Sequence, residues 1–340
     1  MTTLYLAMPD GLLIIRNANG QWQVERRMDG LPVQCVAIDP FRPERQYCGT
    51  FGQGLWRSRD GGDTWRQMET PVFRSLQFTA LAVSMNQRTG DLGNLYAGTE
   101  PTALYRSDDG GDTWRELPNL LTLISAPTWS FPPRPYTSHV RAIGLDPGVP
   151  GGLYVAIEAG ALVHSSNRGD SWDDRVSGSP YDTHTLALPP NAPLTLYAAA
   201  GDGYFESYDG GDRWGTPRAG LRHHYLWGLA VDPAGPETLI VSAASGPNAA
   251  HRAEHAASVI YRRSGFSDWQ RVTDGLPDEQ GTLASVLAAH EAEPHVFYAA
   301  NNHGIYRSAD TGLTWQRLDI PWPDAYRTQR PAEMVVVDVN

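Results

Sequence analysis

The sequence predicts an all-β fold, a seven-bladed β-propeller of four-stranded antiparallel blades. Three observations predict it: a short segment that recurs along the whole chain, a constant order of strands and turns around each copy, and two chain ends that complete each other. The 340 residues are therefore expected to form one domain, 1–340, instead of the several domains that the length alone would allow.

A segment of eight residues that ends in tryptophan occurs in five clear copies. The copies are SRDGGDTW (58–65), SDDGGDTW (107–114), SSNRGDSW (165–172), SYDGGDRW (207–214) and SADTGLTW (308–315). Two degenerate copies end at Trp22 and Trp269, and successive tryptophans are 42 to 58 residues apart. The interval that passes over the two chain ends is 47 residues, so the repeat closes on itself as a ring of seven units.

Each unit repeats one order of strands and turns. In one unit the strand VRAIGLDP is followed by the turn GVPGG, the strand LYVAIEAG, a third strand ending in HSS, a tight polar turn and a fourth strand. Short strands between turn residues are typical of an antiparallel meander, and radial packing buries the faces that one such sheet would expose. The expected blades are 33–68, 76–117, 138–176, 182–218, 223–272, 281–318, and 332–340 combined with 3–26.

The two chain ends are expected to share the last of these blades. The segment AEMVVVDV (332–339) has the pattern of a first strand, but no second strand follows it. Residues 3–8 resemble a second strand with no first strand before it. Pairing of the two segments would close the ring without leaving an open sheet edge.

The recurring segment resembles the Asp box, or BNR repeat, of sialidases, the sortilin family, xyloglucan-active glycosidases and the photosystem II assembly propellers. In that family the box forms the turn between the third and fourth strands of a blade. Asp60 and its equivalents can accept hydrogen bonds from N–H groups of their own turn, and each tryptophan can pack between blades. We therefore expect the boxes to be structural, and Asn167, which replaces the aspartate in one copy, agrees with this.

Composition and charge exclude several function classes. A net charge of −11 argues against binding to nucleic-acid phosphates. All 27 basic residues are arginines, which excludes Schiff-base chemistry on lysine. We find no apolar run that could span a membrane and no signal peptide, so we expect a cytoplasmic monomer. Cys35 and Cys48 should face each other across a hairpin. A disulfide between them is left as an alternative, but free thiols are expected in the cytoplasm.

Three long segments interrupt the repeat, and we call them the first (118–137), second (243–258) and third (319–331) long segments. The order of strands places all three on the propeller face opposite the boxes. Long loops that depart from a regular scaffold commonly carry function. The sequence therefore predicts a ligand site where the central channel opens on that face.

Alignment of the units places one residue of each first strand at this rim, namely Gln34, Thr79, Arg141, His184, Trp227, Ser285 and Glu333. The predicted ligand contacts are Arg141, His184, Trp227, His303, His139, Trp129, Tyr136 and Glu333. Arg141 offers a planar set of donors to an anionic or carbonyl group. Trp227, Trp129 and Tyr136 offer aromatic faces to a sugar or a planar ring.

The sequence leaves three classes of function open. The interpretation we favour is a platform that binds a small molecule, a glycan or a peptide, which is what the resemblance to the assembly propellers implies. The second is a glycoside hydrolase or lyase with Glu158 and Asp202 as its acid/base pair, because these residues occupy equivalent loop positions in adjacent blades. A sialidase itself is disfavoured for two reasons. The chain lacks the Arg-Ile-Pro signature, and the sialidase fold is a ring of six blades, whereas this sequence has seven units.

The third class is a metal enzyme. A divalent ion at the channel mouth would be held by imidazoles from His139, His184, His224 and His303, since imidazole suits zinc, copper and iron. These histidines come from different units, and none of the four has another histidine two or four residues away.

Overall fold

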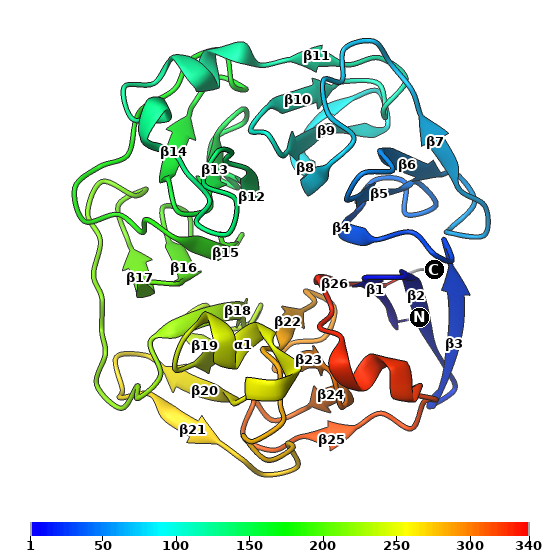
Figure 1. Ribbon diagram of the computed structural model, residues 1–340, viewed down its shortest axis with the longest axis vertical. Helices are drawn as coiled ribbons and strands as arrows, with labels where there is room; N and C mark the ends of the chain where they lie inside the picture. Colours follow the sequence, from blue (N-terminus) through cyan, green and yellow to red (C-terminus); the bar gives the residue numbers. More distant parts are fainter. Residues whose placement is uncertain (1, 339–340) are drawn as a thin grey trace.

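The computed structural model describes residues 2–338, which form seven antiparallel sheets arranged around a central channel (Figure 1). Five of the sheets have four strands and two have three. In the two smaller sheets an isolated bridge occupies the place of the outermost strand, between His164 and Asp173 in one and between Glu206 and Gly215 in the other. The predicted all-β fold of seven blades is confirmed.

Within each blade the first strand lies at the channel and the last lies at the periphery (Figure 1). The blade shared by the chain ends contains β26 (Glu333–Asp338), β1 (Thr2–Met8), β2 (Gly11–Ala18) and β3 (Gln21–Arg27). The next two blades contain β4 (Val33–Ile38), β5 (Gln46–Thr50), β6 (Leu55–Ser58) and β7 (Arg66–Met68), then β8 (Phe78–Thr89), β9 (Leu92–Thr99), β10 (Leu104–Ser107) and β11 (Arg115–Glu116).

The two three-stranded blades follow, with β12 (Val140–Leu145), β13 (Leu153–Ile157) and β14 (Ala161–Ser165), then β15 (Thr183–Ala187), β16 (Leu196–Ala200) and β17 (Gly203–Ser207). The last two blades contain β18 (Tyr225–Val231), β19 (Thr238–Ala244), β20 (Ser258–Ser264) and β21 (Gln270–Val272), then β22 (Val286–Ala289), β23 (Phe297–Asn301), β24 (Gly304–Ser308) and β25 (Gln316–Arg317).

The ring is closed by antiparallel pairing of β26 with β1, as predicted. The register runs from Thr2 opposite Asp338 to Ala7 opposite Glu333, so the C-terminal strand becomes the inner edge of the N-terminal sheet (Figure 1). Val339 and Asn340, which complete the predicted strand and blade, lie outside the described residues. Closure through strands from both ends removes the free edge that an open ring would expose.

Both cysteines are free, as expected, and the sheet register explains why they do not bond. Cys48 pairs with Val36, and successive residues of a strand point to opposite faces. Cys35 therefore lies on the other face, where it packs in the same apolar cluster as Phe78, whereas Cys48 packs in the cluster of Tyr5. Burial raises the pKa of both thiols well above its usual value.

In the recurring eight-residue turns, the polar side chains form hydrogen bonds with N–H groups of the same turn. In the turn 58–65, Gly62 N–H donates to Ser58 Oγ and Thr64 N–H donates to Asp60 Oδ1, both at 2.9 Å. The same two bonds recur in the other four turns, where Asn167 replaces the aspartate once. Gly62 has φ +94°, and a Cβ there would lie 2.6 Å from Ile14 of the adjacent blade. These contacts make the turns part of the scaffold.

All helices of residues 2–338 lie within the three long segments. They are η1 (Pro118–Thr122), η2 (Ala126–Thr128), α1 (Pro247–His251), η3 (Ala253–His255) and η4 (Asp324–Thr328). Each has only three to five residues, so no described helix is long and apolar enough to cross a bilayer. The long segments are thus compact additions that pack on the blades.

Candidate functional site

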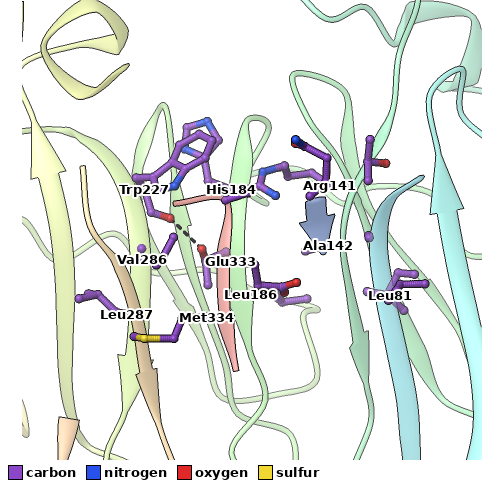
Figure 2. A pocket seen from close by; sticks show the side chains of 17 residues that line it. Leu81, Arg141, Ala142, His184, Leu186, Trp227, Val286, Leu287, Glu333 and Met334 are labelled. Atoms are coloured by element: carbon purple, nitrogen blue, oxygen red, sulfur yellow. Dashed lines mark hydrogen bonds between the residues drawn. The ribbon is translucent and has the colours of Figure 1, made fainter. Parts of the chain in front are cut away.

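A cavity of about 370 Å³ lies between the three long segments, on the propeller face predicted from the sequence. The first segment contributes Phe131 and Arg134, the second contributes His251 and the third contributes Arg330. Below it the channel continues as a cavity of about 220 Å³ lined by the first strands of the blades (Figure 2). Arg141 and Trp227 line both cavities and so mark the boundary between them.

Six of the seven predicted rim residues line the channel cavity, namely Gln34, Thr79, Arg141, His184, Trp227 and Glu333. Ser285 does not line it; it is buried, and its Oγ accepts a hydrogen bond from Asn301. Figure 2 shows Trp227, His184 and Arg141 together at one end of this cavity, with Glu333 and Met334 farther along it.

Five of these rim residues occupy β-bulges, which the sequence did not reveal. Gln34, Thr79, Arg141 and His184 are each skipped in the pairing of first and second strands, and Trp227 is skipped together with Gly228. A bulge leaves its extra residue unpaired and redirects its side chain. The same local irregularity in five blades therefore turns five different polar or aromatic side chains toward one opening.

Glu158 is the central anion of the site. Its Oε2 accepts a hydrogen bond from His139 Nε2 at 2.9 Å and lies 3.4 Å from Arg141 Nε. Its Oε1 lies 3.8 Å from His184 Nε2. Burial alone would raise the pKa of Glu158, but the bond from His139 and the charges of the surrounding cations outweigh burial and lower it to about 2.

A second carboxylate, Asp182, lies beside Glu158. Its Oδ1 accepts a hydrogen bond from Ala159 N–H at 3.0 Å, and its Oδ2 lies 3.7 Å from His184 Nε2. Burial and the negative charges of Glu158 and Asp202 raise the pKa of Asp182 to about 6. Its position depends on Gly201, since a Cβ there would lie 2.0 Å from Asp182 Oδ2.

His184 is fully buried and neutral. Its Nδ1 lies 2.6 Å from the carbonyl oxygen of Leu226, which can only accept, so Nδ1 carries the proton and Nε2 carries a lone pair. Burial lowers the pKa of His184 to about 4. Tyr225 Oη lies 3.4 Å from this Nε2 and 2.8 Å from His251 Nε2.

Two guanidinium groups rest on the ring of Trp227. The guanidinium carbon of Arg330 lies 3.9 Å from the ring centroid and that of Arg141 lies 4.6 Å from it. Within residues 2–338, Arg141 has one carboxylate within 4.0 Å, that of Glu158, and Arg330 has none. Burial and the charge of Arg141 lower the pKa of Arg330 to about 9, which leaves it positively charged at neutral pH.

Arg134 completes the cavity wall but is already paired. Its Nε and Nη2 donate to the two carboxylate oxygens of Glu100, both at 2.6 Å. Its guanidinium carbon lies 4.8 Å from the Phe131 ring centroid. The cation that lacks a carboxylate partner in this cavity is therefore Arg330.

The structure brings six predicted site residues to the two cavities: Arg141, His139, Glu158, His184, Trp227 and Glu333. Trp227 is only 7% exposed, and besides both guanidiniums its ring contacts His184 and His251, each with ring centroids 4.5 Å apart. In this arrangement Trp227 supports charged groups, whereas the sequence predicted that its ring would stack on the ligand.

Five predicted site residues line neither cavity. Trp129 is buried in a core cluster, and its Nε1 donates to Ser125 Oγ. His303 Nε2 lies 3.0 Å from the Gly281 carbonyl oxygen. Tyr136 is 86% exposed, and His224 is also exposed.

The fifth residue, Asp202, is exposed and accepts hydrogen bonds from the N–H groups of Tyr181 and Asp182, both at 3.3 Å. The carboxylate beside Glu158 is thus Asp182. The repeat places Asp182 just upstream of the rim but gives it no role. The repeat also does not indicate that Arg330, which precedes the strand that carries Glu333, belongs to the site.

No protein-family model matches this chain. In an alignment of 173 residues that covers 46% of this chain, it is 28% identical to a probable oligoxyloglucan-reducing end-specific xyloglucanase of Neosartorya fischeri, of which it covers 19%. The GH74 enzyme of Niastella koreensis aligns with a TM-score of 0.68 and 17% identity, over 96% of this chain and 52% of that chain. YCF48 bound to D1 peptide aligns with a TM-score of 0.62 and 16% identity, over 90% of this chain and 92% of that chain.

The two structural alignments show a shared fold. This chain spans about half the length of the GH74 enzyme and about a fifth of the xyloglucanase, whereas it spans nearly all of YCF48.

Proposed function

We propose that this chain is a ligand-binding propeller whose cavity binds the carboxylate group of a peptide. The observation that carries the proposal is the pair of guanidiniums on Trp227, because Arg141 and Arg330 share one carboxylate, Glu158, which only Arg141 approaches within 4.0 Å. A guanidinium held in a partly buried position without an anionic partner is costly, so the site favours an anion brought by a ligand.

The chemistry of arginine favours a carboxylate as that anion. The guanidinium is planar, always charged near neutral pH, and matches the two oxygens of a carboxylate. Two guanidiniums fixed against one ring lose little side-chain freedom when the ligand arrives, which lowers the entropic cost of binding. Partial burial also weakens screening by salt.

The shape of the cavity favours the end of a peptide. Its volume of about 370 Å³ lies in the usual range for a small-ligand pocket. The walls around the arginines include Phe51, Phe131, Pro132, Pro133 and Pro247. These apolar walls suit an aliphatic or aromatic side chain beside the carboxylate. YCF48, which matches this chain over nearly its whole length, is bound to a peptide in its solved structure, and this supports a peptide as the ligand class.

The test uses a library of hexapeptides immobilised through their N termini. The library is made once with free C-terminal carboxylates and once with C-terminal amides, and binding of the full chain is measured by interferometry. We expect selected free-acid peptides to bind and their amides to bind at least tenfold more weakly, since an ionic hydrogen-bonded pair is lost. Equal binding of acids and amides, or no binding to either, would overturn the proposal.

A second function, glycoside hydrolysis, is favoured by one observation. A carboxylate oxygen of Glu158 lies within 4.8 Å of one of Asp182, near the separation of about 5–5.5 Å between carboxyl groups in retaining glycosidases. Incubation with xyloglucan oligosaccharides, followed by measurement of new reducing ends, tests it. Hydrolysis that disappears in both E158Q and D182N would assign catalysis to the pair.

A further inference from the structure

A group of three electron-rich atoms lies beside the arginine site, and the binding of a carboxylate does not use it. Glu158, Asp182 and His184 each offer one atom, and the three atoms lie within 4.8 Å of one another. His184 Nε2 is 3.8 Å from Glu158 Oε1 and 3.7 Å from Asp182 Oδ2. We propose that these three side chains bind one divalent transition-metal ion.

The second polar atom of each side chain is already held by a protein group. Glu158 Oε2 accepts from His139, Asp182 Oδ1 accepts from Ala159 N–H, and His184 Nδ1 donates to the Leu226 carbonyl. Metal ligands are typically oriented in this way, with the far nitrogen of the histidine bonded to a carbonyl and the far oxygen of each carboxylate hydrogen-bonded. Of the remaining atoms, Glu158 Oε1 and Asp182 Oδ2 both lie within 4.0 Å of His184 Nε2.

The burial of His184 is a second observation that favours a cation beside its Nε2 atom. Its side chain is 0% exposed, and its Nε2 lone pair faces two carboxylates with no N–H donor between them. The hydroxyl of Tyr225 lies 3.4 Å from this nitrogen, a long hydrogen bond, and 2.8 Å from His251 Nε2. A metal ion would give the imidazole nitrogen and both carboxylates one shared and stronger partner.

The packing around Asp182 also favours a metal ion at this position. Gly201 is the residue that permits its approach, since any Cβ there would lie 2.0 Å from Oδ2 and 3.3 Å from His184 Cε1. The backbone is therefore built to admit a carboxylate against the imidazole. The carboxylate of Asp182 is 28% exposed, which gives it room to move toward an ion.

One imidazole and two carboxylates select the class of ion. Nitrogen and oxygen donors together suit zinc and its first-row neighbours, whereas calcium and magnesium prefer oxygen alone. Zinc bonds of about 2.0–2.2 Å place tetrahedral ligand atoms about 3.3–3.5 Å apart, so small side-chain shifts would close the site. Three protein ligands leave at least one position open, as in sites where zinc also binds water or a ligand.

A metal ion bound here would favour peptide binding over glycoside hydrolysis, the two functions considered above. With both carboxylates engaged on the ion, neither Glu158 nor Asp182 is free to act as a general acid on a glycoside. The metal site does not depend on the carboxylate-binding proposal, because Arg330 is not among the three ligands.

The experiment uses the full chain without an affinity tag, freed of metal with a chelator and titrated with zinc chloride by calorimetry. The bound ion is then counted by elemental mass spectrometry after dialysis. We expect one zinc per chain, and at least tenfold weaker binding in E158Q and D182N, which keep the side-chain shapes. Cobalt should occupy the same site and give a visible absorption that both variants lose.

Matched controls come from η3 on the same face, where Glu254 and His255 lie outside the cluster. E254Q and H255Q should bind zinc like the parent chain. R330Q should also retain zinc while it loses the peptide, so that the failure of either proposal can be recognised separately. Fewer than about 0.1 zinc per chain, or unchanged affinity in both E158Q and D182N, would overturn the metal site.

Discussion

The guanidinium carbon of Arg330 lies 3.9 Å from the centre of the Trp227 ring. Arg330 comes from the end of the third long segment, and Trp227 comes from a bulge in β18, so the contact joins the variable face to the regular scaffold. Arg141 lies 4.6 Å from the same ring centre. Cation–π attraction to one ring therefore places two like charges close together.

Replacement of Arg330 by glutamine should abolish the preference for free-acid peptides while preserving the fold. The side chain has no described carboxylate partner, and burial opposes its charge, so removal of the charge should leave the free energy of unfolding unchanged or raise it. Peptide affinity should fall at least tenfold. Both quantities can be measured by urea unfolding and interferometry.

Arg327 provides the matched control for this change. It lies in the same segment, is exposed, and pairs with Asp324 at 2.8 Å. R327Q should therefore bind peptides like the parent chain and unfold within about 0.5 kcal/mol of it, as exposed substitutions usually do. If R327Q and R330Q lose affinity to the same extent, general attraction by positive charge would replace recognition by Arg330.

Glu333 should make stability fall as pH rises toward neutrality. Burial raises its pKa to about 7, although the hydrogen bond from Val36 N–H and the charge of Arg141 oppose the rise. Between its usual pKa of about 4.5 and a pH of about 7 the unfolded chain loses the proton first, which favours unfolding. E333Q should therefore be more stable than the parent chain by about 1–3 kcal/mol at pH 8 and equal to it at pH 4. Urea unfolding at both pH values measures this, and an equal difference at both would contradict it.

Trp114 should stabilise the fold without affecting ligand binding. It is 8% exposed and packs between two blades, where its ring centroid lies 5.2 Å from that of Phe73. W114A should lower the free energy of unfolding by about 3–5 kcal/mol, the usual cost of truncating a buried aromatic side chain. Unchanged unfolding would contradict the structural role of the recurring turns, and a change confined to peptide binding would assign them a functional one.

Closure of the ring should depend on β26 and not on the position of the chain ends. Removal of 332–340 leaves β1 with an unpaired inner edge and should abolish cooperative unfolding. A circular permutant is the control: a short linker joins the original ends, and the chain is opened after Gly178, in a turn with open space around it, since a Cβ on this glycine would have no neighbour within 4 Å. The permutant should unfold cooperatively, and a truncated chain that does the same would contradict closure by the shared blade.

The repeat explains why so much of the fold could be predicted. Its period fixed the number of blades, and the incomplete patterns at 3–8 and 332–339 predicted the shared blade. Equivalent positions also predicted rim residues such as Gln34, Arg141 and Glu333, because a repeated strand repeats its geometry. The long segments follow no repeat, so nothing in the sequence distinguished buried Trp129 from exposed Tyr136.

The contacts within the site depend on side-chain packing, which cannot be predicted from the repeat pattern of a single sequence. Arg330 reaches Trp227 from a segment with no equivalent in other blades, and Asp182 approaches His184 because Gly201 leaves room for it. The repeat predicts Asp202 as the partner of Glu158, because the two residues occupy equivalent loop positions in adjacent blades. The structure instead places Asp182 beside Glu158, within 4.8 Å.

The most direct test of the carboxylate site is a crystal structure of the chain with the tightest free-acid peptide from the library. We expect the terminal carboxylate in the cavity of about 370 Å³, with its oxygens about 2.7–2.9 Å from guanidinium nitrogens of both Arg141 and Arg330. A peptide bound on the face of the recurring turns, or one whose carboxylate contacts neither arginine, would contradict it.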